Sequence, residues 1–200
     1  MMTVSSYPYI LMCITFLGHV RVGAYPDGAP ETACDSMRPM HYTVKNDQSS
    51  ELIQPKSWTG LYTLTVNSRG VQPGSDFGVT IASVGANSFK GFLLEARRDG
   101  NGTKRFGTFL NKNYTKLICG NSAITHAQGA ITFTALTAFW VAPKEPLNNI
   151  RFHATLVRQY DEIYLDVTSE FIVGSGVTLV PSVAVLVGVT LINAVTCMFH

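Results

Sequence analysis

Three histidines and a short acidic run are the side chains in this sequence that come nearest to a catalytic or metal-binding set. His41, His126 and His153 lie far apart, without the short spacing typical of zinc ligands. Asp161-Glu162 and Asp166 fall on an expected turn and strand, where a solvated acidic surface accounts for them. The sequence contains no glycine-rich phosphate loop, no Gly-x-Ser-x-Gly and no His-Glu-x-x-His. We therefore predict no catalytic residue, no metal and no cofactor; a metal site that the three histidines form in space is the alternative.

Four cysteines are the other reactive side chains. Cys13 and Cys197 lie in apolar runs at the two ends of the chain, and Cys34 and Cys119 lie between those runs. In a secreted domain, two remaining cysteines are expected to form one disulfide. Chain entropy then predicts a stabilisation of about 4–5 kcal/mol, because the closed loop is long. The alternative is a pair of reduced, buried thiols.

The first apolar run has the features of a secretory leader. Tyr9–Val20 is apolar, and Val22 and Ala24 place small residues where signal peptidase requires them. No Lys or Arg precedes the run, which departs from the usual pattern. We predict a signal peptide over residues 1–24, with a buried N-terminal strand or helix as the alternative.

The second apolar run ends the sequence. Val177–Phe199 contains no charged residue and is long enough to span a bilayer. No Lys or Arg follows it, as one would after a stop-transfer helix, and small residues precede it. Small residues followed by an apolar tail are typical of a GPI-attachment signal. We predict that residues 171–200 are a linker and an apolar helix, with Gly174 or Ser175 as the lipid attachment site. A retained transmembrane helix and a buried core helix are the alternatives.

Charge and glycosylation signals describe the chain between these two ends. The sequence has 15 Lys and Arg against 13 Asp and Glu, which gives no basic footprint for nucleic acid. Two glycosylation sequons begin at Asn101 and Asn113, and both fall in the polar segment Arg98–Lys116. We expect that segment to be an exposed loop or edge hairpin that carries glycans. The presence of two glycosylation sequons in one polar segment agrees with an extracellular protein.

The strand pattern predicts one all-β domain over residues 25–170. Phe89–Arg97 is apolar on both strand faces, Phe89 and Leu93 on one and Phe92, Leu94 and Ala96 on the other, so we expect it to be central and covered on both sides. The flanking segments alternate apolar and polar residues between turn signals, which is typical of a β-sandwich, with a barrel as the alternative. The residues expected to face the core are Tyr62, Leu64, Val66, Phe77, Val79, Ile81, Ile131, Phe133, Phe152, Ala154, Leu156, Ile163, Leu165 and Val167. The residues expected to be more exposed are Thr63, Thr65, Thr132, Thr134, Arg151 and His153. Trp140 is expected in the core.

Several short motifs, in order along the chain, resemble the reeler (reelin-type) domain family. They are Gly28-Ala29-Pro30, Ala33-Cys34 with Met37, Pro39 and His41, Pro73-Gly74, Phe89–Arg97, Cys119, Thr125-His126, Thr132-Phe133, Trp140–Pro143 and Phe152–Thr155. The resemblance is greatest to the small insect defence proteins that consist of this domain. Thr59–Tyr62, where members often have a Ser-Pro-Pro-like segment, and the apolar tail depart from the family pattern.

The resemblance implies an immunoglobulin-like β-sandwich with a disulfide between Cys34 and Cys119. It also implies a non-enzymatic extracellular module, at the cell surface or secreted, with a role in innate immune defence. The expected partners are an extracellular protein or glycan, including a microbial surface, and the membrane through the tail. A structural or matrix-adhesion module and a remnant of a ferric-chelate reductase-like protein are the alternatives.

Overall fold

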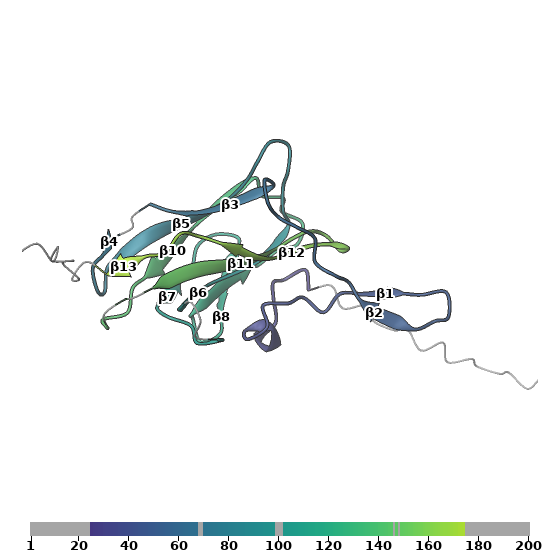
Figure 1. The fold of residues 1–200 in the computed structure, drawn as a ribbon, viewed down its shortest axis with the longest axis horizontal. Helices are drawn as coiled ribbons and strands as arrows, with labels where there is room; N and C mark the ends of the chain where they lie inside the picture. The colour runs from purple at the N-terminus through teal and green to yellow at the C-terminus, as the bar shows by residue number, and fades with distance from the viewer. Residues whose placement is uncertain (1–24, 68–69, 99–101, 146, 148, 175–200) are drawn as a thin grey trace, which may run out of the picture.

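A computed structural model of the chain describes residues 25–67, 70–98, 102–145, 147 and 149–174 (Figure 1). The predicted leader, Asn101, Ser175 and the predicted tail helix lie outside the described residues. Within the described part of the chain, no helix is long and apolar enough to cross a membrane.

Two antiparallel sheets pack face to face and form the predicted β-sandwich (Figure 1). The four-stranded sheet has the order β3 (Tyr62–Val66), β5 (Asp76–Ser83), β10 (Ala135–Val141), β7 (Thr108–Leu110). The five-stranded sheet has the order β12 (Glu162–Thr168), β11 (Ile150–Gln159), β6 (Gly91–Arg98), β9 (Ala123–His126), β8 (Thr115–Ile118). Two separate sheets rule out the barrel.

Three smaller elements accompany the sandwich. A short 3₁₀ helix, η1 (Glu31–Ala33), lies near the N-terminus of the described chain, beside the five-stranded sheet. The hairpin of β1 (Tyr42–Val44) and β2 (Ser50–Leu52) projects away from the sandwich (Figure 1). At the opposite end, β4 (Gly70–Val71) pairs in parallel with β13 (Val173–Gly174).

An aromatic cluster between the two sheets forms the centre of the core. The ring of Phe152, on β11, lies 5.3 Å from Trp140 and 5.9 Å from Phe77, both in edge-to-face geometry. The indole Nε1–H of Trp140 donates a hydrogen bond to the Phe106 carbonyl at 2.9 Å, so its one polar atom is satisfied although the side chain is fully buried. The prediction that Trp140 is a core residue is confirmed.

The predicted inward and outward faces are also confirmed for most strands. On β3, β5 and β11, the residues expected to face the core are buried, or half-buried in the case of Val66. The threonines expected on the outer faces are exposed, whereas Arg151 and His153 are half-buried. The register therefore follows the period of two that a one-sided core imposes.

One prediction of this kind is wrong. Leu165 was expected in the core, but it is only half-buried, and Tyr164 is buried in its place. Strand β12 contains a bulge here, because Leu156 pairs with Tyr164 while Ala154 pairs with Val167. Two residues of β12 therefore oppose one of β11, and the extra residue reverses the alternation.

A second departure lies before β10. Phe133 is buried as expected, through a bridge to Phe89, but Ala135 is exposed and begins the strand. From there Ala138 and Trp140 are the residues that face the core. Their positions are even-numbered whereas Phe133 is odd-numbered, so the inward and outward positions exchange between Phe133 and Ala138. Phe89 lies before β6 begins and packs in the core between the sheets. Its position in the sequence had placed it on the same face as Leu93, which packs under the arm instead.

The polar segment Arg98–Lys116 contains core residues that its polar composition did not predict. Phe106 and Phe109 are buried, and β7 is an edge strand of the four-stranded sheet. The segment was expected to be an exposed loop or edge hairpin; it does contain an edge strand, but these two side chains are buried. Ile172, in the segment predicted as a linker, is fully buried, and its N–H donates to the Ile150 carbonyl at 2.7 Å.

Candidate functional site

The N-terminal arm, residues 25–41, covers the outer face of the five-stranded sheet. The N–H of Ala29 donates to Thr125 Oγ1 at 3.0 Å on β9, and Thr155 Oγ1 on β11 donates to the Met37 carbonyl at 2.6 Å. The His41 ring stacks on Tyr160 at 4.4 Å, just beyond β11. The arm therefore crosses β9, β6 and β11, which explains why β6 is buried on both faces as predicted.

The arm approaches the sheet most closely at Gly28. This glycine has a φ of +96°, and a Cβ there would lie 2.1 Å from the His126 carbonyl oxygen. No larger residue fits that conformation and that distance without moving the arm. Gly28 is the first of the motif residues that carry the family resemblance, and the structure gives it this physical role.

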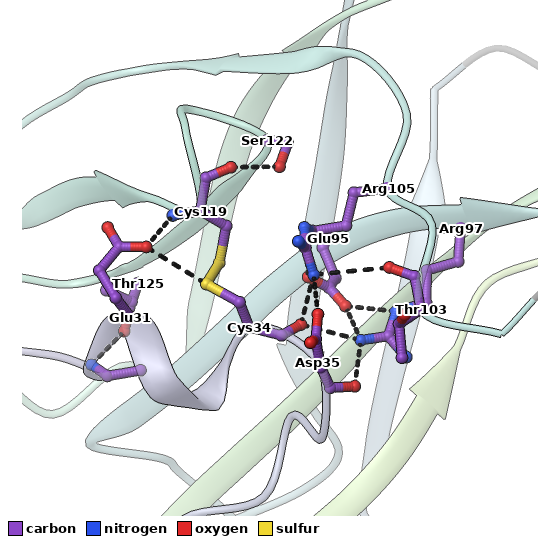
Figure 2. The surroundings of a disulfide bond; sticks show 11 residues. Glu31, Cys34, Asp35, Glu95, Arg97, Thr103, Arg105, Cys119, Ser122 and Thr125 are labelled. Carbon is purple, nitrogen blue, oxygen red and sulfur yellow. Dashed lines mark hydrogen bonds and ion pairs between the residues drawn. A yellow bond between two sulfur atoms is a disulfide. The ribbon is translucent and has the colours of Figure 1, made fainter.

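A disulfide between Cys34 and Cys119 fixes the arm covalently (Figure 2). The two Cα atoms are 5.7 Å apart and 85 residues apart in sequence. Glu31 Oε2 accepts a hydrogen bond from the Cys119 N–H at 2.9 Å. Among the described residues, these three form the one cluster with metal-ligand spacing. Both sulfurs are used in the disulfide, so the cluster offers no thiolate.

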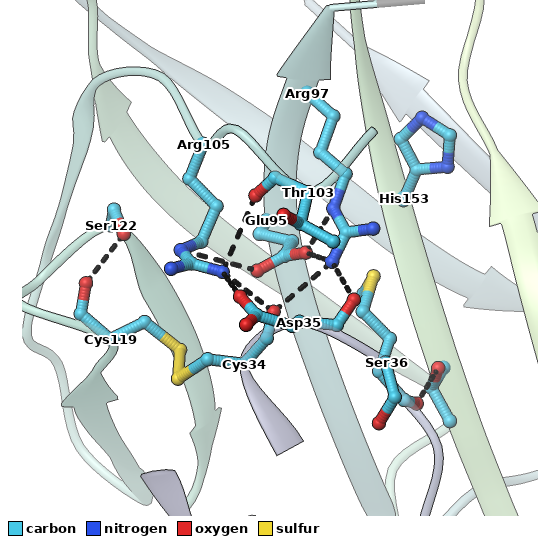
Figure 3. Close-up of polar contacts among 12 residues, drawn as sticks. Cys34, Asp35, Ser36, Glu95, Arg97, Thr103, Arg105, Cys119, Ser122 and His153 are labelled. Carbon is cyan, nitrogen blue, oxygen red and sulfur yellow. Dashed lines mark hydrogen bonds and ion pairs between the residues drawn. A yellow bond between two sulfur atoms is a disulfide. The ribbon is translucent and has the colours of Figure 1, made fainter. Parts of the chain in front are cut away.

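A buried carboxylate beside the disulfide makes the second anchor. We call Glu95, Arg97, Arg105 and Asp35 the Glu95 cluster (Figure 3). Glu95 is fully buried on the outer face of β6, where its Oε1 accepts from the Arg97 guanidinium and its Oε2 lies 4.0 Å from Arg105 Nε. Burying an unpaired carboxylate is costly, so the two arginines are needed to retain it there.

The same two arginines bind the backbone of the arm. Arg97 Nη2 donates to the carbonyl oxygens of Cys34 at 3.1 Å and Asp35 at 2.8 Å. Arg105 Nη1 donates to the Cys34 carbonyl at 2.7 Å and to Asp35 Oδ1 at 3.0 Å. Glu95 thus holds two guanidinium groups in place, and those groups hold the arm, as Figure 3 shows.

The electrostatics of Glu95 support a structural role. Burial raises the pKa of its carboxyl to about 7, although the charges of Arg97 and Arg105 act in the opposite direction. A raised pKa in a cleft would suggest a general acid. Here the carboxyl is fully buried beneath the arm, so it positions the arm and does not meet a substrate.

The three histidines occupy separate environments. His41 Nδ1 lies 2.7 Å from the Tyr160 carbonyl, and the His126 imidazole lies against the backbone of Phe92. Burial lowers the pKa of the His126 imidazole, so it is neutral near pH 7. His153 Nδ1 lies 2.7 Å from Asp166 Oδ1. No two of these histidines share a metal-ligand cluster within the part of the chain that the structure describes.

The acidic residues near the β11–β12 turn are mostly solvated, as expected. Asp161 and Asp166 are exposed, whereas Glu162 is half-buried. Glu162 pairs with Lys56 at 3.2 Å and with Arg158 at 3.6 Å. This patch therefore has local partners and no arrangement that suggests catalysis.

A groove lies between the arm and the sheet, with a volume of about 840 Å³. We call it the arm groove. Its apolar lining includes Met37, Leu93, Val157 and Tyr160, contributed by the arm, β6, β11 and the residue after β11. Sequence reasoning missed this groove, because its walls come together only when the arm crosses the sheet.

The predicted modification sites remain predictions. Asn113 is exposed in a turn before β8, a position accessible to glycosylation, and Asn101 lies outside the described residues. Of the two lipid attachment candidates, Gly174 belongs to β13, where it pairs with Val71, and Ser175 lies outside the described residues.

The two-sheet architecture and the arm held by a disulfide define a disulfide-linked β-sandwich module. The Reeler domain family matches residues 32–178, and the chain belongs to this family. The resemblance that the sequence motifs indicated is therefore confirmed. The human F-spondin reeler domain, a solved structure, has the same fold, with a TM-score of 0.51 and 22% identity over 60% of this chain and 93% of that one.

Two relatives illustrate the proteins in which similar sequences occur. "Putative defense protein 3" of Antheraea mylitta is 28% identical, over 82% of this chain and 93% of its own length. "Putative ferric-chelate reductase 1 homolog" of Drosophila melanogaster is 27% identical over 72% of this chain, but the match covers only 22% of that protein. The similarity to the reductase is thus confined to a small part of it.

Proposed function

We propose that this protein is an extracellular, non-enzymatic recognition module of innate defence that binds a glycan or protein on microbial surfaces. The observation that carries the proposal is the similarity to a protein named for defence, which extends over 82% of this chain and 93% of that protein. The Cys34–Cys119 disulfide supports an extracellular place. Glu95, whose pKa is raised to about 7, is fully buried beneath the arm, which argues against its acting as a catalytic acid.

Sedimentation with killed bacteria and fungal cells tests this proposal. The purified protein is expected to pellet with the cells saturably, and an excess of unlabelled protein should compete with a labelled sample. Protein that has been reduced and alkylated is the matched control, because it has the same sequence without the disulfide that fixes the arm. Recovery no higher than with inert beads of similar size would contradict the defence role and favour the structural or adhesion module.

We also propose that the C-terminal tail attaches the protein to the cell surface through a lipid. The support is the uncharged run Val177–Phe199 after a segment of small residues. Phosphatidylinositol-specific phospholipase C is then expected to release the protein from intact cells that express the full chain. Retention after this treatment, with the tail still detectable by mass spectrometry, would contradict lipid attachment and indicate a transmembrane helix.

A further inference from the structure

The arm groove has the size of a ligand-binding site. Its volume of about 840 Å³ falls within the range of roughly 300–1,000 Å³ that is usual for small-molecule pockets. One side is the arm, with Pro30, Met37 and Pro39, and the other is the outer face of the sheet, with Leu93 and Val157. The disulfide and the Glu95 cluster hold the arm next to this groove, so its walls are pre-formed.

The charges that line the groove have one sign. Arg38, Lys90 and Arg158 line it, and no Asp or Glu is among the described residues that do so. Arg38 donates at 3.2 Å to the Ile53 carbonyl, and Arg158 interacts with Glu162. Lys90 is exposed and makes no ion pair with any residue that the structure describes. Lys90 is therefore the cation best placed to meet an anion from outside.

The neutral part of the lining restricts the ligand further. A small, fully hydrated anion would satisfy Lys90 but would leave the apolar walls in contact with water. An extended hydrocarbon chain would cover those walls and would remove both its own surface and theirs from water. The lining therefore fits a molecule with both an anionic group and an apolar chain.

We propose that the arm groove binds an anionic amphiphile with a single acyl chain, the anionic group at Lys90 and the chain between the arm and the sheet. The inference goes beyond the proposed function and stands on the groove alone. It holds whether or not the protein binds microbial surfaces, so the failure of one proposal leaves the other intact.

Fluorescence titration with a dansyl-labelled fatty acid, below its critical micelle concentration, tests the inference on the purified protein. The emission is expected to rise and shift to the blue on binding, and oleate should displace the probe. Oleylamine has the same chain with a positive charge and should compete far less well. Equal competition by oleate and oleylamine, or displacement by polyglutamate, would overturn the proposal, as would the absence of probe binding.

Two variants locate the ligand. Lys90→Glu is expected to weaken binding about tenfold, because it replaces an attraction with a repulsion. Lys144→Glu makes the same charge change at an exposed position outside the groove and should leave binding unchanged. Val157→Trp should block the chain, with thermal unfolding measured to confirm that the variant folds. Equal affinities for Lys90→Glu and Lys144→Glu would show that the ligand does not meet Lys90.

Discussion

Replacing both Cys34 and Cys119 by serine is expected to lower the free energy of unfolding by about 4 kcal/mol. The disulfide closes a loop of 85 residues, and in the chain-entropy account a loop of this length stabilises by about 4–5 kcal/mol. Urea unfolding of the purified double variant and the wild type measures the difference. The arm should also become more sensitive to limited proteolysis, because only hydrogen bonds and ion pairs then hold it.

Two comparisons make this result interpretable. Reduction of the wild type with dithiothreitol should reproduce the loss seen in the double variant, since both remove the same cross-link. Thr32→Ser, at an exposed position in η1, should unfold like the wild type. A double variant within about 1 kcal/mol of the wild type would contradict this prediction. Either the unfolded chain would already be restricted without the disulfide, or the other contacts of the arm would suffice to stabilise the native state.

Replacing Arg97 by methionine is the second change with a large expected effect. Near pH 8 the variant should lose about 3–5 kcal/mol, because it leaves the fully buried Glu95 carboxylate with only the more distant Arg105. The arm also loses the bonds from Arg97 to the Cys34 and Asp35 carbonyls. Arg158→Met is the matched control, since it removes a partly exposed ion pair with Glu162 and should cost below about 1 kcal/mol.

The pH dependence of stability identifies Glu95 as the cause. Its pKa is raised in the folded state from an ordinary 4.5 to about 7, so the folded protein holds the proton more tightly than the unfolded chain does. The stabilising effect is therefore fully present below about pH 4.5 and is lost as the pH rises through about 7. The change is at most about 3–4 kcal/mol, from about 1.4 kcal/mol per pKa unit.

Two further variants separate this effect from other titrations. Glu95→Gln should abolish the component of the pH profile that belongs to Glu95, leaving the opposite slope expected from His126, whose pKa is lowered by burial. In the Glu95→Gln background, Arg97→Met should cost much less than in the wild type, because no buried charge is left unpaired. An Arg97→Met penalty that is the same near pH 5 and pH 8 would contradict this account.

The amino-acid sequence by itself determined the architecture of the sandwich. The alternation in β3, β5 and β11 placed residues such as Leu64, Val79 and Phe152 on the correct face, because a strand buried on one side imposes a period of two. Cys34 and Cys119, the two cysteines between the apolar ends, indicated the disulfide that the structure contains. The motifs around Phe89–Arg97 indicated the family. Each of these signals is local, or is a choice among very few partners.

Tertiary structure alone decided which segment covers the outer face of the five-stranded sheet. In the sequence, the only sign of the Glu95 cluster is a glutamate within an otherwise apolar strand. Arg97 and Arg105 are near Glu95 in the sequence, but the arm that they hold comes from a distant part of the chain, as the contact between Met37 and Thr155 shows for the arm as a whole. The bulge that moved Leu165 out of the core is likewise set by pairing with β11. Hydrophobic periodicity shows which residues of a strand face the core. It does not specify the path that the chain takes across the outer face of a sheet, and the arm groove depends on that path.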